Sequence, residues 1–415
     1  MNELYQIEIT DLAFGGEGVG RIENMVCFVP FTAPGDLVQV EITQHKKKFL
    51  RGKVVAFDTR SPKRVEAPCP YFGDCGGCQW QHIDYSQQLE SKRAHLQHVL
   101  HKSAKIDYPV PPVIASPKDY HYRRTAQLKV NAAGELGFFR EHSNTVVPID
   151  QCLVMEPALN AVIPRIKEKI AGLQEKISPQ LPLEVEIISE DGKSAAFHFL
   201  YKGRHSTQSF LQANREVNTH LQEFILRHVR EHVQSGQTGH AGQTVIDLFC
   251  GDGNLSLPLA NLGVQVIGYD ISRPAIKKAR RAAEKIEASG LESPAKSGAG
   301  VGAEAGTSSS YSFRKAPFQE IIKTLTELAP QTQVAIFDPP RQGLDGKAES
   351  MAALGIPLIL YVSCNPGILA RDLSSFVHAG YEIAELQPMD MFPHTYHLET
   401  AVALTLEASH KKNGE

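Results

Sequence analysis

A cysteine and a glutamate in the last part of the sequence are suited to covalent chemistry. Cys364 directly follows the apolar run 358–363, which is typical of a buried strand, and Glu399 follows a run of aromatic and polar residues. A thiol can add to a substrate as a nucleophile, and a carboxylate can later remove a proton so that the thiol leaves by elimination. A buried cysteine is more often an inert apolar residue, so the neighbours of Cys364 have to decide its role.

A glycine turn is the first of these neighbours. The apolar run 245–249 leads into a turn with Gly251 and Gly253, and both glycines let a ligand approach the backbone at the carboxyl end of the strand. After a second strand, Asp270 offers a carboxylate that can accept hydrogen bonds from a ribose diol. A dinucleotide site is the alternative, but Ser256 occupies the place of the third glycine in its fingerprint. The turn instead resembles the D-x-F-x-G-x-G motif of S-adenosylmethionine-dependent methyltransferases.

Another carboxylate ends the apolar run 334–337. Asp338 begins the sequence Asp-Pro-Pro-Arg, which nearly matches the N/D-P-P-Y/F motif of methyltransferases that modify amino groups of adenine or cytosine. Arg341 stands where those enzymes carry a stacking aromatic residue. Because a cysteine also ends the next strand, amino methylation is the minor alternative.

Three of the seven cysteines are crowded into a C-x5-C-x2-C spacing at Cys69, Cys75 and Cys78, and Cys152 follows well downstream. In a long chain without a secretory signal, such thiols indicate metal ligation or catalysis and not disulfides. Four thiolates suit either structural zinc or an iron-sulfur cluster. The spacing alone favours zinc slightly, although the two C-x-x-C knuckles that are usual for zinc are missing from it.

Three segments of different pattern must position these residues. Residues 1–58 contain short strands and glycine or proline turns, which predicts an OB-like β-barrel. Residues 59–238 mix the cysteines with amphipathic helices and β-rich stretches, which predicts a central α+β domain. Residues 239–415 alternate strands and helices, which predicts an α/β domain with a Rossmann-like, doubly wound parallel sheet. Its predicted strands are residues 244–249, 264–270, 334–338 and 358–363, with a helix at 272–288.

The composition is that of an ordinary soluble globular protein, with 42% hydrophobic and 21% charged residues. No apolar run approaches the roughly 18 residues of a membrane-spanning helix, and the beginning lacks a secretory pattern, so we expect a cytoplasmic protein without a membrane partner. Residues 288–310 are poor in large apolar groups, which predicts a flexible surface insertion. No protein partner is indicated, and a monomer is the default expectation.

The charge pattern bears on nucleic-acid binding. A net charge of −3 does not by itself indicate a protein that binds nucleic acid, because such proteins often carry a large positive charge. Basic residues gather locally, however, and could contact phosphates at 45–48, 63–64, 121–124 and 277–281.

The motifs around the cysteine and the glutamate resemble those of the RNA uracil-5 methyltransferase family. This resemblance rests on residues 363–366 (Ser-Cys-Asn-Pro) with 369–372, and on residues 390–399. Residues 13–21 and 28–30 resemble a TRAM domain, an OB-like barrel that binds RNA. The resemblance covers nearly the whole chain, because barrel, cysteine segment and catalytic segment occur in the order of the family.

The resemblance implies a mechanism and a set of site residues. Carbon 5 of a uracil is a poor nucleophile until a thiolate adds to carbon 6, and the resulting enolate can attack the methyl group of S-adenosylmethionine. Cys364 is implied as the nucleophile, and Glu399 as the base that removes the carbon-5 proton. The implied cofactor-binding residues are Gln212, Phe249, Gly251, Gly253, Asn254, Asp270 and Asp338.

The resemblance also favours iron over zinc. Members of the family carry a [4Fe-4S] cluster at a C-x5-C-G-G-C element plus a distant cysteine, which matches Cys69, Cys75, Cys78 and Cys152. Its implied role is to hold the central domain, since methyl transfer needs no electron. Residues 79–82 and 122–124 belong to the same pattern and are expected to line the path of the RNA, with packing against the cluster as the equal alternative for Trp80.

An RNA substrate follows from this resemblance. The barrel together with the cluster is most similar to the enzymes that act on 23S ribosomal RNA, and a uridine in the T-loop of transfer RNA is the alternative. A competing hypothesis is an RNA-binding protein that has lost its activity. Intact Cys364, Glu399, Asp338 and glycine turn argue against such a loss.

Overall fold

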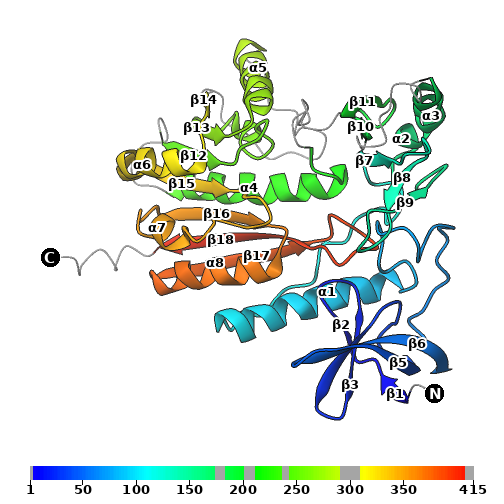
Figure 1. Cartoon of the computed structure of the whole chain (residues 1–415). Coiled ribbons are helices and arrows are strands. Elements are labelled where there is room, and N and C mark those ends of the chain that lie inside the picture. The colour runs from blue at the N-terminus through cyan, green and yellow to red at the C-terminus, as the bar shows by residue number, and fades with distance from the viewer. Residues whose placement is uncertain (1–2, 173–182, 201–210, 236–242, 290–308, 407–415) are drawn as a thin grey trace.

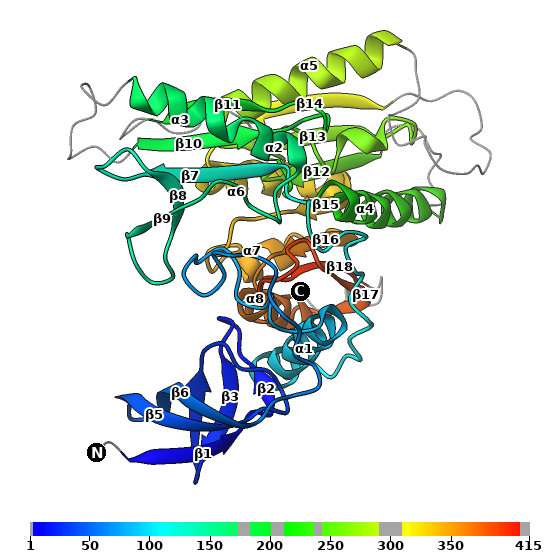
Figure 2. The ribbon, with the colours of Figure 1, turned by 90° about the vertical axis from the view of Figure 1, so that its right-hand side faces the viewer.

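The computed structural model describes residues 3–172, 183–200, 211–235, 243–289 and 309–406. Three β-sheets of six, five and seven strands organise the chain. Figure 1 shows the six-stranded barrel below, the seven-stranded sheet on the left and the five-stranded sheet at the upper right, and Figure 2 shows the same arrangement after a quarter turn. Within the described ranges, no helix is both long and apolar enough to cross a membrane. Most of the insertion predicted at residues 288–310 lies outside these ranges.

The amino-terminal sheet is a small barrel with strand order β1-β5-β6-β4-β3-β2. Ile7, Val29 and Val38 are among the side chains that fill its core. At Gly20 an added Cβ would lie 2.2 Å from Cγ2 of Ile7, so the barrel closes only because glycine lets β3 approach β1. The β-rich amino-terminal domain predicted from the sequence is confirmed. Its strands are β1 (Leu4–Glu8), β2 (Asp11–Leu12), β3 (Gly18–Ile22), β4 (Met25–Val29), β5 (Leu37–His45) and β6 (Phe49–Thr59).

The five-stranded sheet has the order β11-β10-β7-β8-β9, and all its pairs are antiparallel. Ile163, Ile166 and Ile170 recur at helical spacing and pack against the apolar face of this sheet. The strands are β7 (Thr125–Val130), β8 (Leu136–Phe139), β9 (Val146–Pro148), β10 (Leu183–Ile188) and β11 (Ala196–Leu200), and the helices are α2 (Pro157–Ala161) and α3 (Ile163–Ala171).

The seven-stranded sheet has the order β14-β13-β12-β15-β16-β18-β17. Its first five strands are parallel, whereas β18 runs antiparallel between β16 and β17. The four strands predicted from the sequence are all present at their predicted places, as is the predicted helix. The strands are β12 (Thr244–Leu248), β13 (Gln265–Asp270), β14 (Ser310–Lys315), β15 (Thr332–Phe337), β16 (Leu358–Ser363), β17 (Tyr381–Met389) and β18 (Glu399–Leu406), and the helix is α5 (Arg273–Ser289).

Helices cover both faces of this sheet, as a doubly wound fold requires. Val245 and Ile246 point to opposite faces, because successive side chains alternate along a strand. On the face of Ile246 lie α6 (Phe318–Leu328), α7 (Ala348–Ala352), α8 (Pro366–His378), α1 (Tyr85–Val99) and the π-helix η1 (Leu100–Ala104). On the face of Val245 lies α4 (Arg215–Ser235). The short 3-10 helices are η3 (Leu257–Leu259) and η4 (Ala329–Gln331).

Two helices of the predicted central domain therefore pack in the core of the carboxyl-terminal sheet. Leu96 of α1 and Leu221 of α4 are fully buried among residues of that sheet. The domain boundaries at residues 58 and 238 stay predictions. The packing shows that the chain between them contributes to two structural units.

Candidate active site

The register of the sheet brings the predicted nucleophile and base together. Ser363 of β16 pairs with Thr400 of β18 in antiparallel register. The next facing positions along the two strands are Cys364 and Glu399, and side chains at such cross-strand positions have Cβ atoms about 5 Å apart. The thiol and the carboxyl group therefore meet at one edge of the sheet, and Cys364 is partly buried while Glu399 is 4% exposed.

Asp338, which is only partly buried, adds a second acid beside the buried Glu399 at this edge. Phe337 of β15 pairs with Tyr361 of β16, so the residue after it lies beside the end of the strand that carries the thiol. Burial raises the pKa of Asp338. Burial also raises the pKa of Glu399 well above its usual range, and the neighbouring charge of Asp338 raises it further. Two carboxyl groups in one poorly hydrated site cannot both ionise easily, so protons are shared between them near neutral pH.

The Cys364 thiol is protonated in the free protein. Burial and the Glu399 carboxylate together raise its pKa to about 11, although the Arg341 guanidinium opposes the change. Cys364 stands just before α8, whose N-cap Asn365 accepts hydrogen bonds from the backbone N–H groups of Gly367 at 3.1 Å and Ile368 at 3.4 Å. The cap fixes the amino-terminal end of α8, where the helix dipole favours a thiolate.

The glycine turn lies at the carboxyl end of β12 beside Asp270. The N–H of Gly251 donates to Oδ2 of Asp270 at 2.9 Å, and the N–H of Ser272 donates to Oδ1 at 2.6 Å. Phe249 has a φ of +63°, an uncommon conformation for a residue with a side chain, and its ring lies 4.9 Å from that of Phe318. Such backbone strain is typical of functional turns.

Space for a ligand is present at Gly251 and not at Gly253. A Cβ added to Gly251 would have no atom within 4 Å, whereas one added to Gly253 would lie 2.7 Å from Cγ of Leu257. Gly251 therefore faces an opening, and Gly253 allows the turn to pack against η3. The Asp270 carboxylate retains acceptor capacity beyond its two backbone bonds, which fits a ribose diol at this opening.

The side chains of Asn254 and Gln212 are held by protein neighbours. Asn254 exchanges two amide hydrogen bonds with Asn218 of α4, at 3.0 Å and 2.9 Å, and also accepts from Gln222. Gln212 is 5% exposed, and its backbone carbonyl accepts a hydrogen bond from Nε of Arg124 at 2.8 Å. Asn254 thus anchors the glycine turn to α4, and direct contact of either side chain with a cofactor stays a prediction.

Replacing Gly251 by valine is expected to weaken cofactor binding at least about tenfold, because the branched side chain fills the opening in front of Asp270. Titration calorimetry with S-adenosylhomocysteine measures this effect. Gly355→Ala is the control. Gly355 has a φ of +64°, similar to the +56° of Gly251, but it precedes β16 and so lies at the opposite edge of the sheet. Equal affinity of the Gly251→Val protein and the control would contradict this placement of the cofactor.

The loop between β17 and β18, residues 390–398, carries Glu399 at its end and is fixed by α1. Nζ of Lys92 donates to Oδ1 of Asp390 at 2.7 Å, and both side chains are fully buried. Gln88 accepts from the N–H of His394 at 2.9 Å. The Tyr122 hydroxyl donates to the carbonyl of Pro393 at 3.1 Å. The base is therefore positioned by residues that lie far away in the sequence.

The cysteine segment also holds this loop. The N–H groups of Gln79 and Trp80 donate to the carbonyl of His394 at 2.9 Å and 3.0 Å. Nε1 of Trp80 donates to the carbonyl of Gly16 at 3.0 Å, which ties the barrel to the same junction. The expectation that Trp80 lines the RNA path does not fit its burial at 2% exposure.

Sequence reasoning missed several of these residues. Lys92 gave no signal, because α1 is polar on most of its surface and a lysine there is normally solvated. Phe14 of the barrel contacts the Tyr396 ring at 5.0 Å, edge to face, and stacks on His95 at 5.4 Å. An aromatic residue inside a glycine-rich loop was the available sequence signal that this loop packs against another surface.

Two predicted phosphate-contacting arginines have internal partners. Arg64 forms an ion pair with the buried Asp36 at 2.8 Å, and Arg124 is 9% exposed beside Gln212. Both guanidinium groups stabilise the protein itself, so the runs at 63–64 and 121–124 are not simple solvated cationic patches.

The four clustered thiols share one neighbourhood. The charges of Cys69 and Cys152 raise the pKa of Cys75, and burial raises it more, to about 11. Burial raises the pKa of Cys78 to about 12, and the same partners add to this shift. In the part of the chain that the structure describes, no three Cys, His, Asp or Glu side chains are arranged to hold a single metal ion.

Comparisons with known proteins agree with this geometry. The sequence model of the tRNA (uracil-5-)-methyltransferase family matches residues 176–407, and that of the TRAM domain matches residues 2–55. The 23S rRNA (uracil(1939)-C(5))-methyltransferase RlmD of Salmonella typhi is 29% identical, with 96% of each chain aligned. An uncharacterized RNA methyltransferase of Aquifex aeolicus is 27% identical over 97% of this chain and 98% of its own.

A solved structure matches the fold over nearly the whole chain. The tRNA (uracil-54, C5)-methyltransferase of Pyrococcus abyssi, in complex with S-adenosyl-L-homocysteine, has a TM-score of 0.68 and 26% sequence identity. The match covers 96% of this chain and 99% of the Pyrococcus chain.

Proposed function

The chain belongs to the tRNA (uracil-5-)-methyltransferase family and is an RNA uracil-5 methyltransferase that uses S-adenosylmethionine, and on that basis we propose that it methylates a uridine of 23S rRNA through a covalent adduct of Cys364. The observation that carries the proposed mechanism is the placement of Cys364 and Glu399 at facing ends of β16 and β18.

The residues at this edge divide the reaction between them. Bound S-adenosylmethionine supplies an electrophilic methyl group, and Asp270 and the opening at Gly251 would hold it. Cys364 releases its thiol proton to water, and the thiolate sulfur bonds to carbon 6 of uracil, which moves electron density to carbon 5. Carbon 5 then takes the methyl group, and S-adenosylhomocysteine would leave as the second product. Glu399 then accepts the proton from carbon 5, the double bond between carbons 5 and 6 re-forms, and the thiolate leaves.

The rate of methyl transfer is expected to rise with pH. Burial raises the pKa of both Cys364 and Glu399, so the thiolate and the carboxylate forms that the reaction needs become more populated as protons are removed. Where one deprotonation limits the rate, the rise approaches about tenfold per pH unit. Single-turnover measurements from roughly pH 6 to 9 at constant ionic strength check this. A rate that is flat or falls over this window would exclude the assignment of these two groups.

The choice of 23S rRNA rests on the similarity to the Salmonella enzyme, whereas the Pyrococcus structure favours transfer RNA as the second candidate. Mapping 5-methyluridine in the RNAs of a strain that lacks the gene distinguishes them. Loss of the base from one 23S site, restored by the wild-type gene and not by a Cys364→Ala gene, supports the proposal. Loss from the T-loop of transfer RNA replaces it with the alternative.

Cys69, Cys75, Cys78 and Cys152 are proposed to hold a [4Fe-4S] cluster. Their mutual electrostatic effects place them in one neighbourhood, and Sγ of Cys75 accepts the N–H of Gly77 at 3.4 Å, a bond of the kind that surrounds such clusters.

Metal analysis of protein purified without oxygen tests the cluster. We expect iron and acid-labile sulfide in equal amounts, and a Cys75→Ser protein that has lost both. Stoichiometric zinc in the wild-type protein would show that the four thiols serve a different site.

A further inference from the structure

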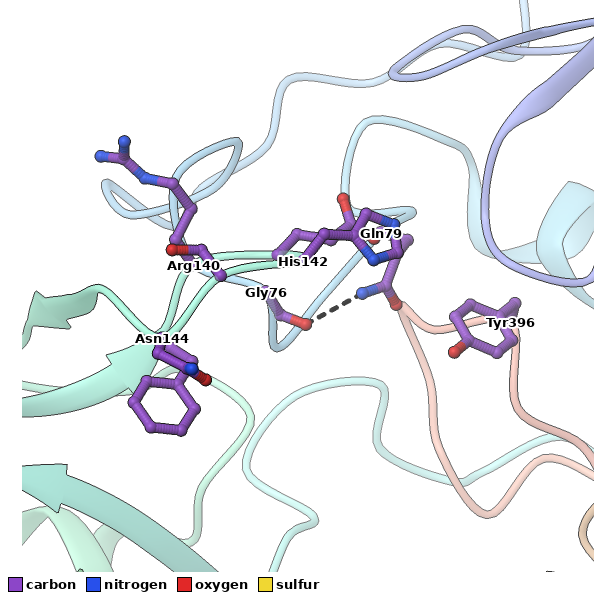
Figure 3. Close-up of a pocket in the computed structure, with 9 residues that line it drawn as sticks. Gly76, Gln79, Arg140, His142, Asn144 and Tyr396 are labelled. Carbon is purple, nitrogen blue, oxygen red and sulfur yellow. Dashed lines mark hydrogen bonds between the residues drawn. The ribbon is translucent and has the colours of Figure 1, made fainter. Parts of the chain in front are cut away.

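A polar cavity of about 600 Å³ lies where three parts of the chain meet (Figure 3). They are the segment around Cys75 and Cys78 (the cysteine segment), the five-stranded sheet, and the loop of residues 390–398 that precedes Glu399 (the catalytic loop). Gly76 and Gln79 form one wall, and the turn between β8 and β9, residues 139–144, forms a second. Tyr396 forms the third wall. The volume is in the range of typical small-molecule pockets.

The lining of this cavity combines polar groups, the carboxyl group of Glu141 and an aromatic ring, which suits a planar ligand that offers hydrogen-bond donors. Gln79, His142 and Asn144 offer hydrogen-bond donors and acceptors, and Tyr396 offers an aromatic ring. Arg140 is of little use to a ligand here, because its guanidinium pairs with Asp74 at 3.3 Å and extends away from the other labelled side chains in Figure 3. Unstacked RNA bases are recognised in this way, by stacking on aromatic rings and by hydrogen bonds to their edges.

The cavity is continuous with the catalytic loop. Tyr396 stands three positions before Glu399, and its ring lies 4.4 Å from that of His397. Burial and the charge of Arg341, which also acts on Cys364, together lower the pKa of His397 to about 4. The cavity therefore shares a wall residue with the loop that ends at Glu399.

The walls are held rigidly. The N–H of Gly76 donates to the carbonyl of Phe139 at 2.9 Å, and a Cβ added to Gly76 would lie 2.9 Å from the backbone nitrogen of Glu141. On the other side, a Cβ added to Gly16 would lie 2.6 Å from Cβ of Gln79. The loop between Cys75 and Cys78 is thus packed between the hairpin turn and the barrel.

We propose that this cavity receives one unstacked base of the substrate RNA, a neighbour of the methylated uridine, with Tyr396 against its face and Gln79, His142 and Asn144 at its edge. The inference rests on the proposed function, since it assumes that the uridine enters at Cys364. It gives the cysteine segment a direct part in substrate selection, because Gly76 and Gln79 flank Cys78.

Abasic RNA tests the proposal. The test protein is His142→Gly/Asn144→Ala, which removes two edge contacts. Glycine suits position 142 because His142 has a φ of +51°. The matched control is Ala132→Asn, in the exposed turn at the other end of β8. The RNAs are short transcripts around the mapped uridine, each lacking the base at one flanking nucleotide, and dissociation constants are measured for every combination.

One abasic position is expected to weaken binding to the wild-type and control proteins by about tenfold to a hundredfold. It should weaken binding to the double variant clearly less, because that protein has already lost the edge contacts of His142 and Asn144 and only the contacts with Tyr396 and Gln79 remain. If every abasic RNA weakens both proteins equally, the cavity holds no base and the proposal fails. The proposed function is judged separately, by 5-methyluridine formed on the intact RNA. If removing one base weakens the wild-type protein more than the double variant, but the intact RNA is not methylated, the cavity assignment stands and the proposed function is wrong.

Discussion

A Glu399→Gln protein is expected to accumulate a covalent complex with its RNA in the presence of S-adenosylmethionine. The amide cannot accept the carbon-5 proton, so the methylated uracil stays bonded to the Cys364 sulfur. Turnover should fall by about 10²–10⁴-fold, which is the usual contribution of a general base. Denaturing gel electrophoresis of labelled RNA with the protein shows the complex directly.

The nucleophile variant provides the opposite control. Cys364→Ala should form no complex and should lose turnover at least as severely, because no sulfur is present to activate carbon 5. A double variant with both changes should behave like Cys364→Ala. A Glu399→Gln protein that turns over normally, or a complex that forms without the Cys364 sulfur, would refute the division of roles between these residues.

Lys92→Met is expected to lower the free energy of unfolding by about 3–5 kcal/mol. The ammonium group is fully buried against Asp390, and its removal leaves a buried carboxylate without its cation. Burial also lowers the pKa of Lys92, which reports the same lack of water. Urea denaturation followed by circular dichroism measures the change.

Two further proteins separate the buried charge from other causes. Lys92→Met/Asp390→Asn should recover much of the loss, because no uncompensated charge remains. Lys118→Met removes an exposed ion pair of the same 2.7 Å length, with Glu216, and should change stability by no more than about 1 kcal/mol. Similar losses for Lys92→Met and Lys118→Met would mean that burial does not decide the energy of the pair.

Much of the seven-stranded sheet could be predicted from the sequence, since each strand is an apolar run with a polar residue at its end. Asp270, Asp338 and Cys364 all stand at such ends, and parallel strands place their carboxyl ends at one edge. The antiparallel register that sets Glu399 opposite Cys364 could not be derived in this way. It depends on β18 being inserted between β16 and β17, which no local pattern encodes.

The residues that hold the loop before Glu399 were less predictable from the sequence, for a physical reason. Lys92 and Asp390 are separated by most of the chain, and each is hydrophilic by composition, so only tertiary packing makes them buried. The packing of helices α1 and α4 was hard to predict for a similar reason. Most of the α1 surface is polar, and the apolar face of α4 does not tell which sheet it will cover. The middle of the chain was therefore the part where residue patterns and structural units differ most.

The junction of Gly16, Trp80 and His394 has a consequence for the geometry of the substrate. The indole hydrogen bond of Trp80 to Gly16, the two backbone hydrogen bonds to His394 and a glycine without room for a methyl group hold the barrel against the loop that carries His394. The distance between the barrel and the edge of the sheet that carries Cys364 is then fixed. An RNA that binds at both places must present its uridine at a set spacing from the nucleotides on the barrel. Inserting or deleting a nucleotide between the uridine and the nucleotides on the barrel would prevent the RNA from binding at both places at once, even if every base that the protein touches were kept.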